Sequence, residues 1–236
     1  MSNEEVSTQR AYYKDTAQQY DAAHVDERDE HYLALRFLDA AIDYYGITSV
    51  LDVGAGTGRV ALHLKARHPG LKIVSVEPVK ELREVGHAKG LSETDLIEGD
   101  ATKLQFPDGA FDLVSEIGVL HHVRDPAAVV AEMLRVAKVG IFISDSNNFG
   151  QGSFLSRSLK QFIHALGLWK VANWFKTMGK GYQITEGDGL AYSYSVFKNY
   201  EQIARVCRTH ILNTTPAGIN PYRTASHVAL VGIKKK

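Results

Sequence analysis

Three glycines at alternate positions, Gly54, Gly56 and Gly58, follow an apolar run that ends in an acid, Asp52. Glycine lets the backbone turn sharply, and in the absence of side chains a ligand can lie against the main chain. If a helix begins directly after the turn, its N–H groups favour a negatively charged group. The stretch VLDVGAGTGR, residues 50–59, therefore predicts a binding site for a flat or anionic ligand.

Two more acids stand in equivalent places later in the chain. Glu77 ends the run 72–77, 19 residues after Gly58, and Asp100 follows the run 95–99. A carboxylate placed like that of Glu77 can accept hydrogen bonds from both hydroxyls of a ribose. Because the carboxyl ends of parallel strands meet at one edge of a sheet, three acids at successive strand ends give a much stronger signal than the glycines alone.

Short β-branched runs, separated by helical patterns, must position these residues. The runs are apolar almost throughout, which is typical of strands buried on both faces of a parallel sheet. We expect strands at 50–53, 72–77, 95–99, 111–116 and 139–145, with 208–213 and 227–235 as a closing antiparallel pair. The pattern predicts an α/β fold with a doubly wound, mainly parallel, seven-stranded sheet.

The glycine spacing separates two kinds of ligand. A dinucleotide-binding fingerprint, G-x-G-x-x-G/A, needs a small residue at the position that Arg59 occupies. The sequence therefore disfavours a dinucleotide-dependent oxidoreductase.

In order and type, the motifs between residues 10 and 145 resemble those of the class I S-adenosylmethionine-dependent methyltransferases, above all their small-molecule branch. The resemblance implies a Rossmann-like methyltransferase fold and S-adenosylmethionine as the cofactor. It further implies that Gly54, Ala55 and Gly56 border the methionine portion and that Asp52 orients its amino group. The remaining implied contacts are Glu77 with the ribose, Pro78, Asp100 and Ala101 with the adenine, and Glu116 and Ile117 along the cofactor.

On this basis we expect one methyltransferase domain over residues 1–236. Residues 1–48 form an N-terminal helical cover, 49–145 the cofactor-binding core, 146–200 a substrate-lid insertion at the edge of the sheet, and 201–236 the closing strands. The segment 12–21 resembles the helix that closes over the cofactor in this family. Within it Tyr20 is a candidate for the cofactor carboxylate and Tyr12 for the acceptor side, with ordinary helix packing as the alternative.

A general base for the acceptor is expected just after the fourth strand, where His121 and His122 stand. Imidazole titrates near neutral pH, and in a first helical turn at most one of the two rings faces the site. The alternative is a structural histidine that bonds a neighbouring loop. His31 is placed in a polar helix, away from the chemistry.

The insertion is expected to select the acceptor. Leu155, Leu159, Phe162, Ile163 and Leu166 share one helical face, which in an ordinary globular protein covers the core. The glycine-rich and tyrosine-rich stretch 179–197 suits a mobile loop, and the candidates for lining an acceptor pocket are Tyr182, Tyr192 and Tyr194.

Charge is unevenly divided along the chain. From Ser146 to Thr185 there is no acid, whereas five Lys or Arg residues are present; residues 1–30 carry eight acids against three Lys or Arg. The basic segment suits an anionic or amphiphilic acceptor. The other interpretations are shallow contact with a membrane surface and a solvated basic face that complements the acidic N-terminal segment; the last is preferred.

Composition restricts the remaining function classes. The formal net charge is zero, so no nucleic acid partner is expected, and the single Cys207 cannot form an internal disulfide. We expect a cytoplasmic enzyme that methylates an oxygen or nitrogen of a small molecule. No metal site is expected, because Glu116 stands where the metal-dependent enzymes of this class carry an aspartate. RNA or protein methylation and non-catalytic cofactor binding are the alternatives.

Overall fold

A seven-stranded sheet forms the centre of the computed structural model, which describes residues 3–21, 29–185, 189–215 and 219–235. The strands of this sheet are β1 (Ser49–Val53), β2 (Lys72–Val76), β3 (Leu96–Ile97), β4 (Phe111–Ile117), β5 (Ala137–Ser146), β8 (Cys207–Asn213) and β9 (His227–Lys234). Their order is β3-β2-β1-β4-β5-β9-β8, and β9 runs antiparallel to both of its neighbours. This confirms the predicted fold class.

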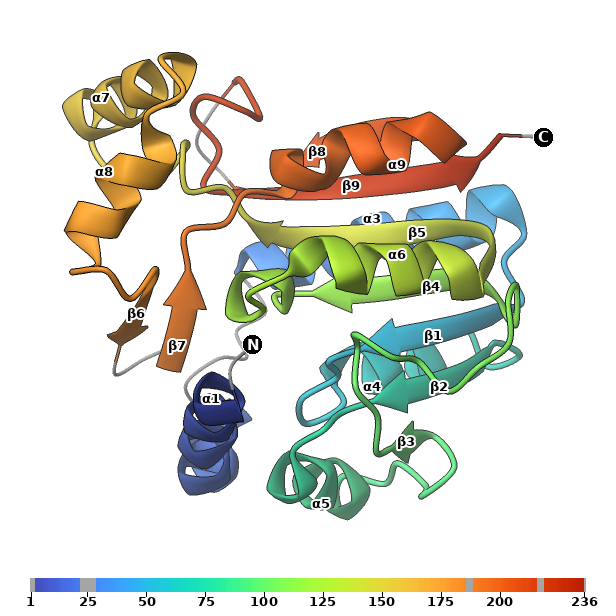
Figure 1. Ribbon diagram of the computed structural model, residues 1–236. Coiled ribbons are helices and arrows are strands. Elements are labelled where there is room, and N and C mark those ends of the chain that lie inside the picture. The colour runs from blue at the N-terminus through green and yellow to red at the C-terminus, as the bar shows by residue number, and fades with distance from the viewer. Residues whose placement is uncertain (1–2, 22–28, 186–188, 216–218, 236) are drawn as a thin grey trace.

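Helices cover both faces of the sheet (Figure 1). On one face lie α3 (Glu30–Tyr45) and α4 (Arg59–Arg67), with α5 (Lys80–Ala88) beside β3. On the other face lie α6 (Pro126–Val136) and α9 (Tyr200–Val206), which follows the short helix η3 (Val196–Asn199). Buried apolar side chains from each helical layer and from the strands form one core cluster on each side of the sheet.

Capping residues and glycine mark the ends of the helices. Asp29 caps α3, its carboxylate accepting the N–H of Tyr32 at 2.6 Å, and Gly46 ends the helix with a φ of 63°. Asp125 caps α6 in the same way, with Pro126 as the first helical residue. Leu35, Leu38 and Ile42 of α3 are buried, and their spacing of three and four residues places them on one face of the helix.

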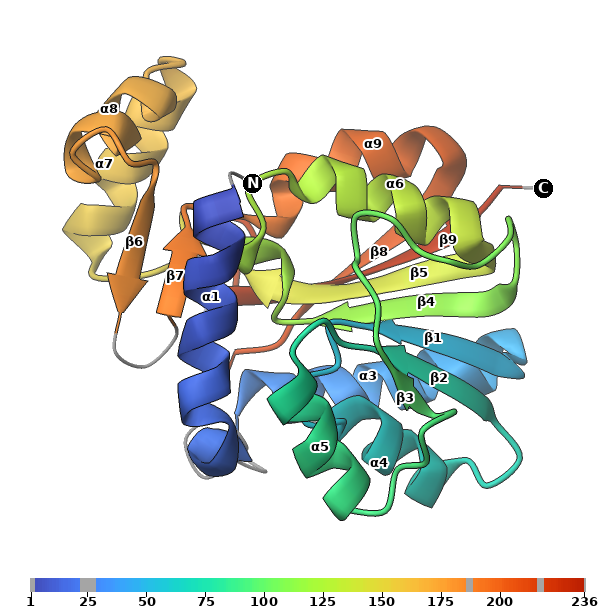
Figure 2. The same ribbon diagram turned by 60° about the horizontal axis from the view of Figure 1, so that its bottom comes forward.

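The order of the strands reverses between β1 and β4, which leaves a crevice at the carboxyl ends of the strands. Helix α1 (Asn3–Thr16) and the short helix η1 (Ala17–Gln19) lie across this end of the sheet (Figure 2). The short helix η2 (Leu120–His122) follows β4 at the same end. Asp21 holds the N-terminal segment to the glycine turn by accepting the hydroxyl of Thr57 at 2.5 Å.

The segment between β5 and β9 differs from its sequence-based interpretation. Part of the stretch 179–197 is an antiparallel hairpin, β6 (Tyr182–Thr185) with β7 (Gly189–Tyr192), rather than a loop. Helices α7 (Phe154–Ala165) and α8 (Trp169–Lys176) do not cover the core, since neither contains a buried residue. Figures 1 and 2 show both helices standing away from the sheet. No helix in the described part of the chain is long and apolar enough to cross a membrane.

The glycine turn yields the first testable prediction. Gly58 has a φ of 82°, and a Cβ at this position would lie 2.1 Å from Cδ1 of Leu91. We expect Gly58→Ala to lower the free energy of unfolding by about 2 to 4 kcal/mol, measured by urea denaturation, because strain and overpacking add. Gly70→Ala is the matched control, since its Cβ would meet no atom within 4 Å. Equal stability of the two variants would contradict this account of the turn.

Candidate functional site

The glycine turn is fixed by hydrogen bonds to the end of β2. The N–H groups of Gly54 and Ala55 donate to the carbonyl of Val76 at 2.9 and 3.1 Å, and the N–H of Gly56 donates to Oε2 of Glu77 at 2.9 Å. Gly54 and Gly56 have φ angles of 72° and 55°, in the left-handed region. A Cβ on Gly54 would lie 2.5 Å from the Val119 side chain, so this position must stay bare.

A cavity of about 340 Å³ lies against this turn at the carboxyl ends of the strands. This volume falls within the range of small-molecule sites. Nine residues predicted from the sequence line it: Tyr20, Gly54, Gly56, Glu77, Pro78, Asp100, Ala101, Ile117 and His122. They come from η1, the glycine turn, the ends of β2, β3 and β4, and η2, so the fold gathers parts of the chain that are about a hundred residues apart.

Two of the acids that line this cavity, Glu77 and Asp100, differ in their surroundings. Glu77 is buried and accepts the N–H groups of Gly56 and Val79, both at 2.9 Å. Burial raises the pKa of Glu77, although these N–H groups and Arg83 oppose the shift. Asp100 is exposed, and its Oδ1 accepts the N–H and the hydroxyl of Thr102 at 2.8 and 2.7 Å.

A second, smaller cavity of about 100 Å³ adjoins the first. Six residues line both cavities: Tyr13, Tyr20, Gly54, Ile117, Gly118 and His122. Asp52, Ala55 and His121 line only the second cavity. Arg59, which argued against a dinucleotide, forms part of its wall by binding both carboxylate oxygens of Asp29 at 2.8 and 2.9 Å.

Asp52 is a buried acid with one oxygen that the described protein leaves without a hydrogen bond. It is 1% exposed; Oδ1 accepts the Ser115 hydroxyl at 3.3 Å, and Oδ2 has no hydrogen-bond partner among the described residues. Burial and, to a lesser degree, the Glu77 carboxylate raise the pKa of Asp52 to about 7. A ligand cation beside Asp52 would therefore stabilise the ionised form.

His121 is oriented by a buried carboxylate. Nδ1 of His121 donates to Oδ1 of Asp145 at 2.8 Å, and the N–H of Leu120 donates to Oδ2 at 2.7 Å. Burial opposes ionisation of Asp145, but His121 and backbone N–H groups outweigh it and lower the pKa of Asp145. Because Asp145 then accepts the Nδ1 proton, the lone pair of His121 lies on Nε2.

Glu116, predicted to lie along the cofactor, is wholly buried beneath the turn and lines neither of these two cavities. Its Oε2 accepts the N–H of Val119 at 3.1 Å. Burial and the neighbouring Asp145 carboxylate raise the pKa of Glu116 well above its ordinary value. Successive strand residues point to opposite faces, so Ile117 reaches the cavity and Glu116 does not.

His122 joins three elements. Its Nδ1 donates to the carbonyl of Leu190 on β7 at 2.7 Å, and its Nε2 accepts the hydroxyl of Tyr13 on α1 at 2.9 Å. The N–H of Leu190 donates in turn to Oε1 of Gln9 at 2.5 Å. The two histidines predicted as candidate bases are thus held differently: His121 by a carboxylate, His122 by the cover.

The predicted acceptor tyrosines are not brought into either cavity. Tyr194 is buried and donates to Oδ1 of Asn199 at 2.9 Å. Tyr182 and Tyr192 pack on each other across the β6–β7 hairpin, with ring centroids 6.0 Å apart. Tyr12 packs edge-on against Tyr13 at 5.3 Å.

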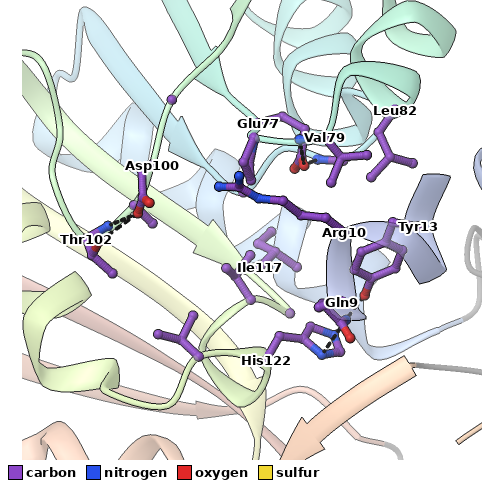
Figure 3. A pocket seen from close by; sticks show the side chains of 18 of the residues that line it. Gln9, Arg10, Tyr13, Glu77, Val79, Leu82, Asp100, Thr102, Ile117 and His122 are labelled. Atoms are coloured by element: carbon purple, nitrogen blue, oxygen red, sulfur yellow. Dashed lines mark hydrogen bonds between the residues drawn. The ribbon is translucent and has the colours of Figure 1, made fainter. Parts of the chain in front are cut away.

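Several lining residues were missed from the sequence. Gln9 and Arg10 lie on α1, and in Figure 3 the Arg10 side chain extends along the first cavity toward Glu77. His31 lines the second cavity, where its Nδ1 is buried without a hydrogen-bond partner among the described residues. These residues belong to segments whose sequence shows only helix, so no local signal marked them. No cluster of three or more His, Cys, Asp or Glu suited to a metal occurs in the described ranges.

The chain is similar to known proteins in the sequence of its central part and in its fold. Residues 51–143 match the family described as "Methyltransferase domain". The chain is 39% identical over 100 residues to ajmaline N-methyltransferase of Rauvolfia serpentina, covering 40% of this chain and 34% of that protein. It is 38% identical over 95 residues to demethylmenaquinone methyltransferase of Thermus thermophilus, covering 39% of this chain and 43% of that protein. The matches thus span less than half the length of these relatives.

A solved structure shows the same fold over nearly the whole chain. It is magnesium protoporphyrin IX methyltransferase from Synechocystis PCC 6803 with bound SAH, with a TM-score of 0.63 and 14% identity over 98% of this chain and 100% of that chain.

The raised pKa of Asp52 predicts a pH-dependent stability. The folded protein keeps this proton up to about pH 7, whereas the unfolded chain loses it near 3.8. Stability from this group is therefore lost as pH rises through that window. We expect Asp52→Asn to raise the free energy of unfolding relative to the wild type, and this difference should be roughly 2 kcal/mol larger at pH 8 than at pH 5. Urea denaturation at the two pH values measures it. Glu93→Gln, at an exposed acid, is the control, and equal pH profiles for wild type and Asp52→Asn would refute the shift.

Proposed function

Because residues 51–143 match a methyltransferase domain and the chain has the fold of the class I S-adenosylmethionine-dependent methyltransferases, we propose that the protein transfers a methyl group from S-adenosylmethionine to an oxygen or nitrogen of a small molecule. The observation that carries this proposal is the cavity along the glycine turn, lined by Glu77, Asp100 and the N-terminal cover, with Asp52 in the adjoining second cavity.

The residues present fit this cofactor. The orphan oxygen of Asp52 suits the ammonium group of the methionine portion, and the bare backbone of Gly54 and Gly56 leaves room beside it. Glu77 retains lone pairs for the ribose hydroxyls, since each carboxylate oxygen accepts more than one hydrogen bond. Pro78, Ala101 and Leu82 supply apolar surface for the adenine. When bound, S-adenosylmethionine supplies a methyl group on a positively charged sulfur.

In this proposal the second cavity receives two groups: the ammonium end of the methionine portion beside Asp52, and the reacting group of the acceptor beside His121. It adjoins the first through Gly54, Ile117 and Gly118, and His121 lines it. Asp145 fixes the tautomer of His121, so Nε2 accepts a proton from the acceptor hydroxyl or ammonium group. The Asp145 carboxylate stabilises the imidazolium that results. Tyr13 of the same cover lines both cavities, and we expect the cover to limit the entry of water, which favours transfer to the acceptor over hydrolysis.

The size of the second cavity limits which part of an acceptor can enter it. The small second cavity, of about 100 Å³, suits a hydroxyl or amino group at the end of a molecule whose remainder lies outside. Incubation of the protein with S-adenosylmethionine and a metabolite panel, with detection of S-adenosylhomocysteine, tests the activity. Absence of turnover with every acceptor, despite tight cofactor binding, would favour a non-catalytic binding protein.

If Glu77 binds the ribose hydroxyls, its side chain contributes to the affinity for S-adenosylmethionine. We expect Glu77→Ala to weaken S-adenosylmethionine binding by about 1 to 3 kcal/mol in calorimetry, because charged hydrogen bonds to the ribose are lost. Glu77→Gln removes the charge but keeps a side-chain oxygen that can accept the N–H of Gly56. Thermal unfolding of both variants shows whether the glycine turn is still folded. Glu98→Ala, at an exposed acid beyond β3, is the control. Unchanged affinity of both Glu77 variants, or heat on adding NAD or NADP, would show that the ligand is assigned wrongly.

Catalysis depends on His121 and Asp145. We expect His121→Gln to lower kcat by about 10² to 10⁴-fold and Asp145→Asn to lower it at least about tenfold, without a comparable change in cofactor affinity. The measurement is steady-state release of S-adenosylhomocysteine with the acceptor found in the panel. His210→Gln, on β8 and bonded to Tyr45, is the control. If kcat of His121→Gln equals that of the control, His121 is not the base.

A further inference from the structure

Helix α7 presents its apolar side chains to solvent. Phe154, Leu155, Leu159, Phe162 and Leu166 are between 56% and 77% exposed. The last four recur at helical spacing, so they form one continuous stripe. In a globular protein such a stripe normally faces the core.

Helix α8 and its flanks continue this surface. Leu168, Val171, Trp174, Phe175 and Met178 are between 52% and 86% exposed. Together the two helices supply ten of the sixteen exposed large apolar side chains in the described part of the chain. We call these ten side chains the α7–α8 surface. So concentrated an apolar patch marks a site that another apolar phase covers.

The polar side of α7 faces the protein. The ammonium group of Lys160 donates to the carbonyls of Asn148 and Gln151, and Gln161 donates to the carbonyls of Phe149 and Arg223 at 3.0 and 2.9 Å. These bonds anchor the helix with its apolar stripe outward. The apolar stripe of α7 is therefore exposed because specific hydrogen bonds hold the polar side of the helix against the protein. A helix that covers a core has the opposite orientation.

The charged residues of the segment that forms this surface have one sign. No acid occurs from residue 146 to residue 185, whereas Arg157, Lys160, Lys170, Lys176 and Lys180 do. Burial and the nearby charges of Lys176 and Arg157 lower the pKa of Lys160, which shows that cations of the two helices lie close together. A partner for this face must accept both apolar insertion and positive charge.

A second copy of the chain meets only the first requirement. Two α7–α8 surfaces packed on each other would bring the cations of both copies together, with no acid in either segment to pair with them. A bilayer with anionic lipids meets both requirements, because apolar and aromatic side chains enter the acyl boundary while lysines reach the headgroups.

We propose that the α7–α8 surface docks the protein on an anionic lipid bilayer. The apolar stripes of α7 and α8 insert at the interface, and Lys170, Lys176 and Lys180 contact the headgroups. This inference goes beyond methyl transfer and does not rest on it. Helix α8 leads into the β6–β7 hairpin, whose Leu190 binds His122, so the docked surface is linked to the wall of the site.

The experiment uses the full chain with two kinds of vesicle. Vesicles of phosphatidylcholine alone are compared with vesicles that contain about 30% phosphatidylglycerol, by co-sedimentation and by tryptophan fluorescence. We expect at least tenfold stronger partitioning to the anionic vesicles, a blue shift from the exposed Trp174, and weaker binding at high salt. No binding, or equal binding to both kinds of vesicle, overturns the proposal.

Matched variants locate the docking face. Leu159→Ser, Phe162→Ser and Phe175→Ser combined, and separately Lys170→Glu, Lys176→Glu and Lys180→Glu combined, are each expected to lower partitioning at least tenfold. The apolar control combines Tyr44→Ser, Val206→Ser and Ile219→Ser, at exposed positions elsewhere. The charge control combines Lys103→Glu, Lys138→Glu and Lys198→Glu, also at exposed positions.

Two results would refute the location or the partner. Equal loss of partitioning in the controls would place the membrane contact elsewhere. Concentration-dependent dimerisation in sedimentation velocity, abolished by the serine variant of the α7–α8 surface, would show that a second copy covers this face. Retained S-adenosylmethionine binding in each variant shows that the cofactor site is intact, so failure of docking is distinguishable from failure of the proposed function.

Discussion

The hydrogen bonds between the glycine turn and the end of β2 are the constraint on which the site depends. They tie Gly54, Ala55 and Gly56 to Val76 and Glu77, so the ends of two parallel strands cannot move independently. This arrangement holds the Glu77 carboxylate at the cavity wall while satisfying two backbone N–H groups. It also forces Val119 against the bare Gly54, which fixes the path of the chain after β4.

Three buried carboxylates, those of Asp52, Glu77 and Glu116, lie at this one end of the sheet, and burial raises the pKa of each. Such a concentration of buried acids is costly unless protons or a positively charged ligand neutralise it. A ligand with cationic ammonium and sulfonium groups matches this need. Asp145 is the exception, since His121 keeps it ionised and thereby becomes oriented for proton transfer.

The two ends of the insertion serve the molecule differently. The β6–β7 hairpin closes onto α1 and His122 through the backbone of Leu190, and so belongs to the wall of the site. Helix α7 is anchored by its polar side chains, and both α7 and α8 leave their apolar side chains exposed. One part of the insertion therefore contacts the candidate site. The other part exposes an apolar surface that requires a partner outside the protein.

The sequence by itself determined the seven strands of the sheet, their doubly wound arrangement, the glycine turn and the carboxylates at the ends of β1, β2 and β3, because periodicity and local turn chemistry mark these features. Only the tertiary structure decided which side chains meet. Strand alternation turned Glu116 away from the cavity, and the path of residues 3–21 brought Arg10 and Tyr13 to it. The pattern at Leu155, Leu159 and Phe162 predicted an apolar helical face but not its direction. That direction depends on Lys160, which donates to a carbonyl of the preceding loop, and on Gln161, which donates to the carbonyl of Arg223. Such contacts leave no periodic trace in the sequence.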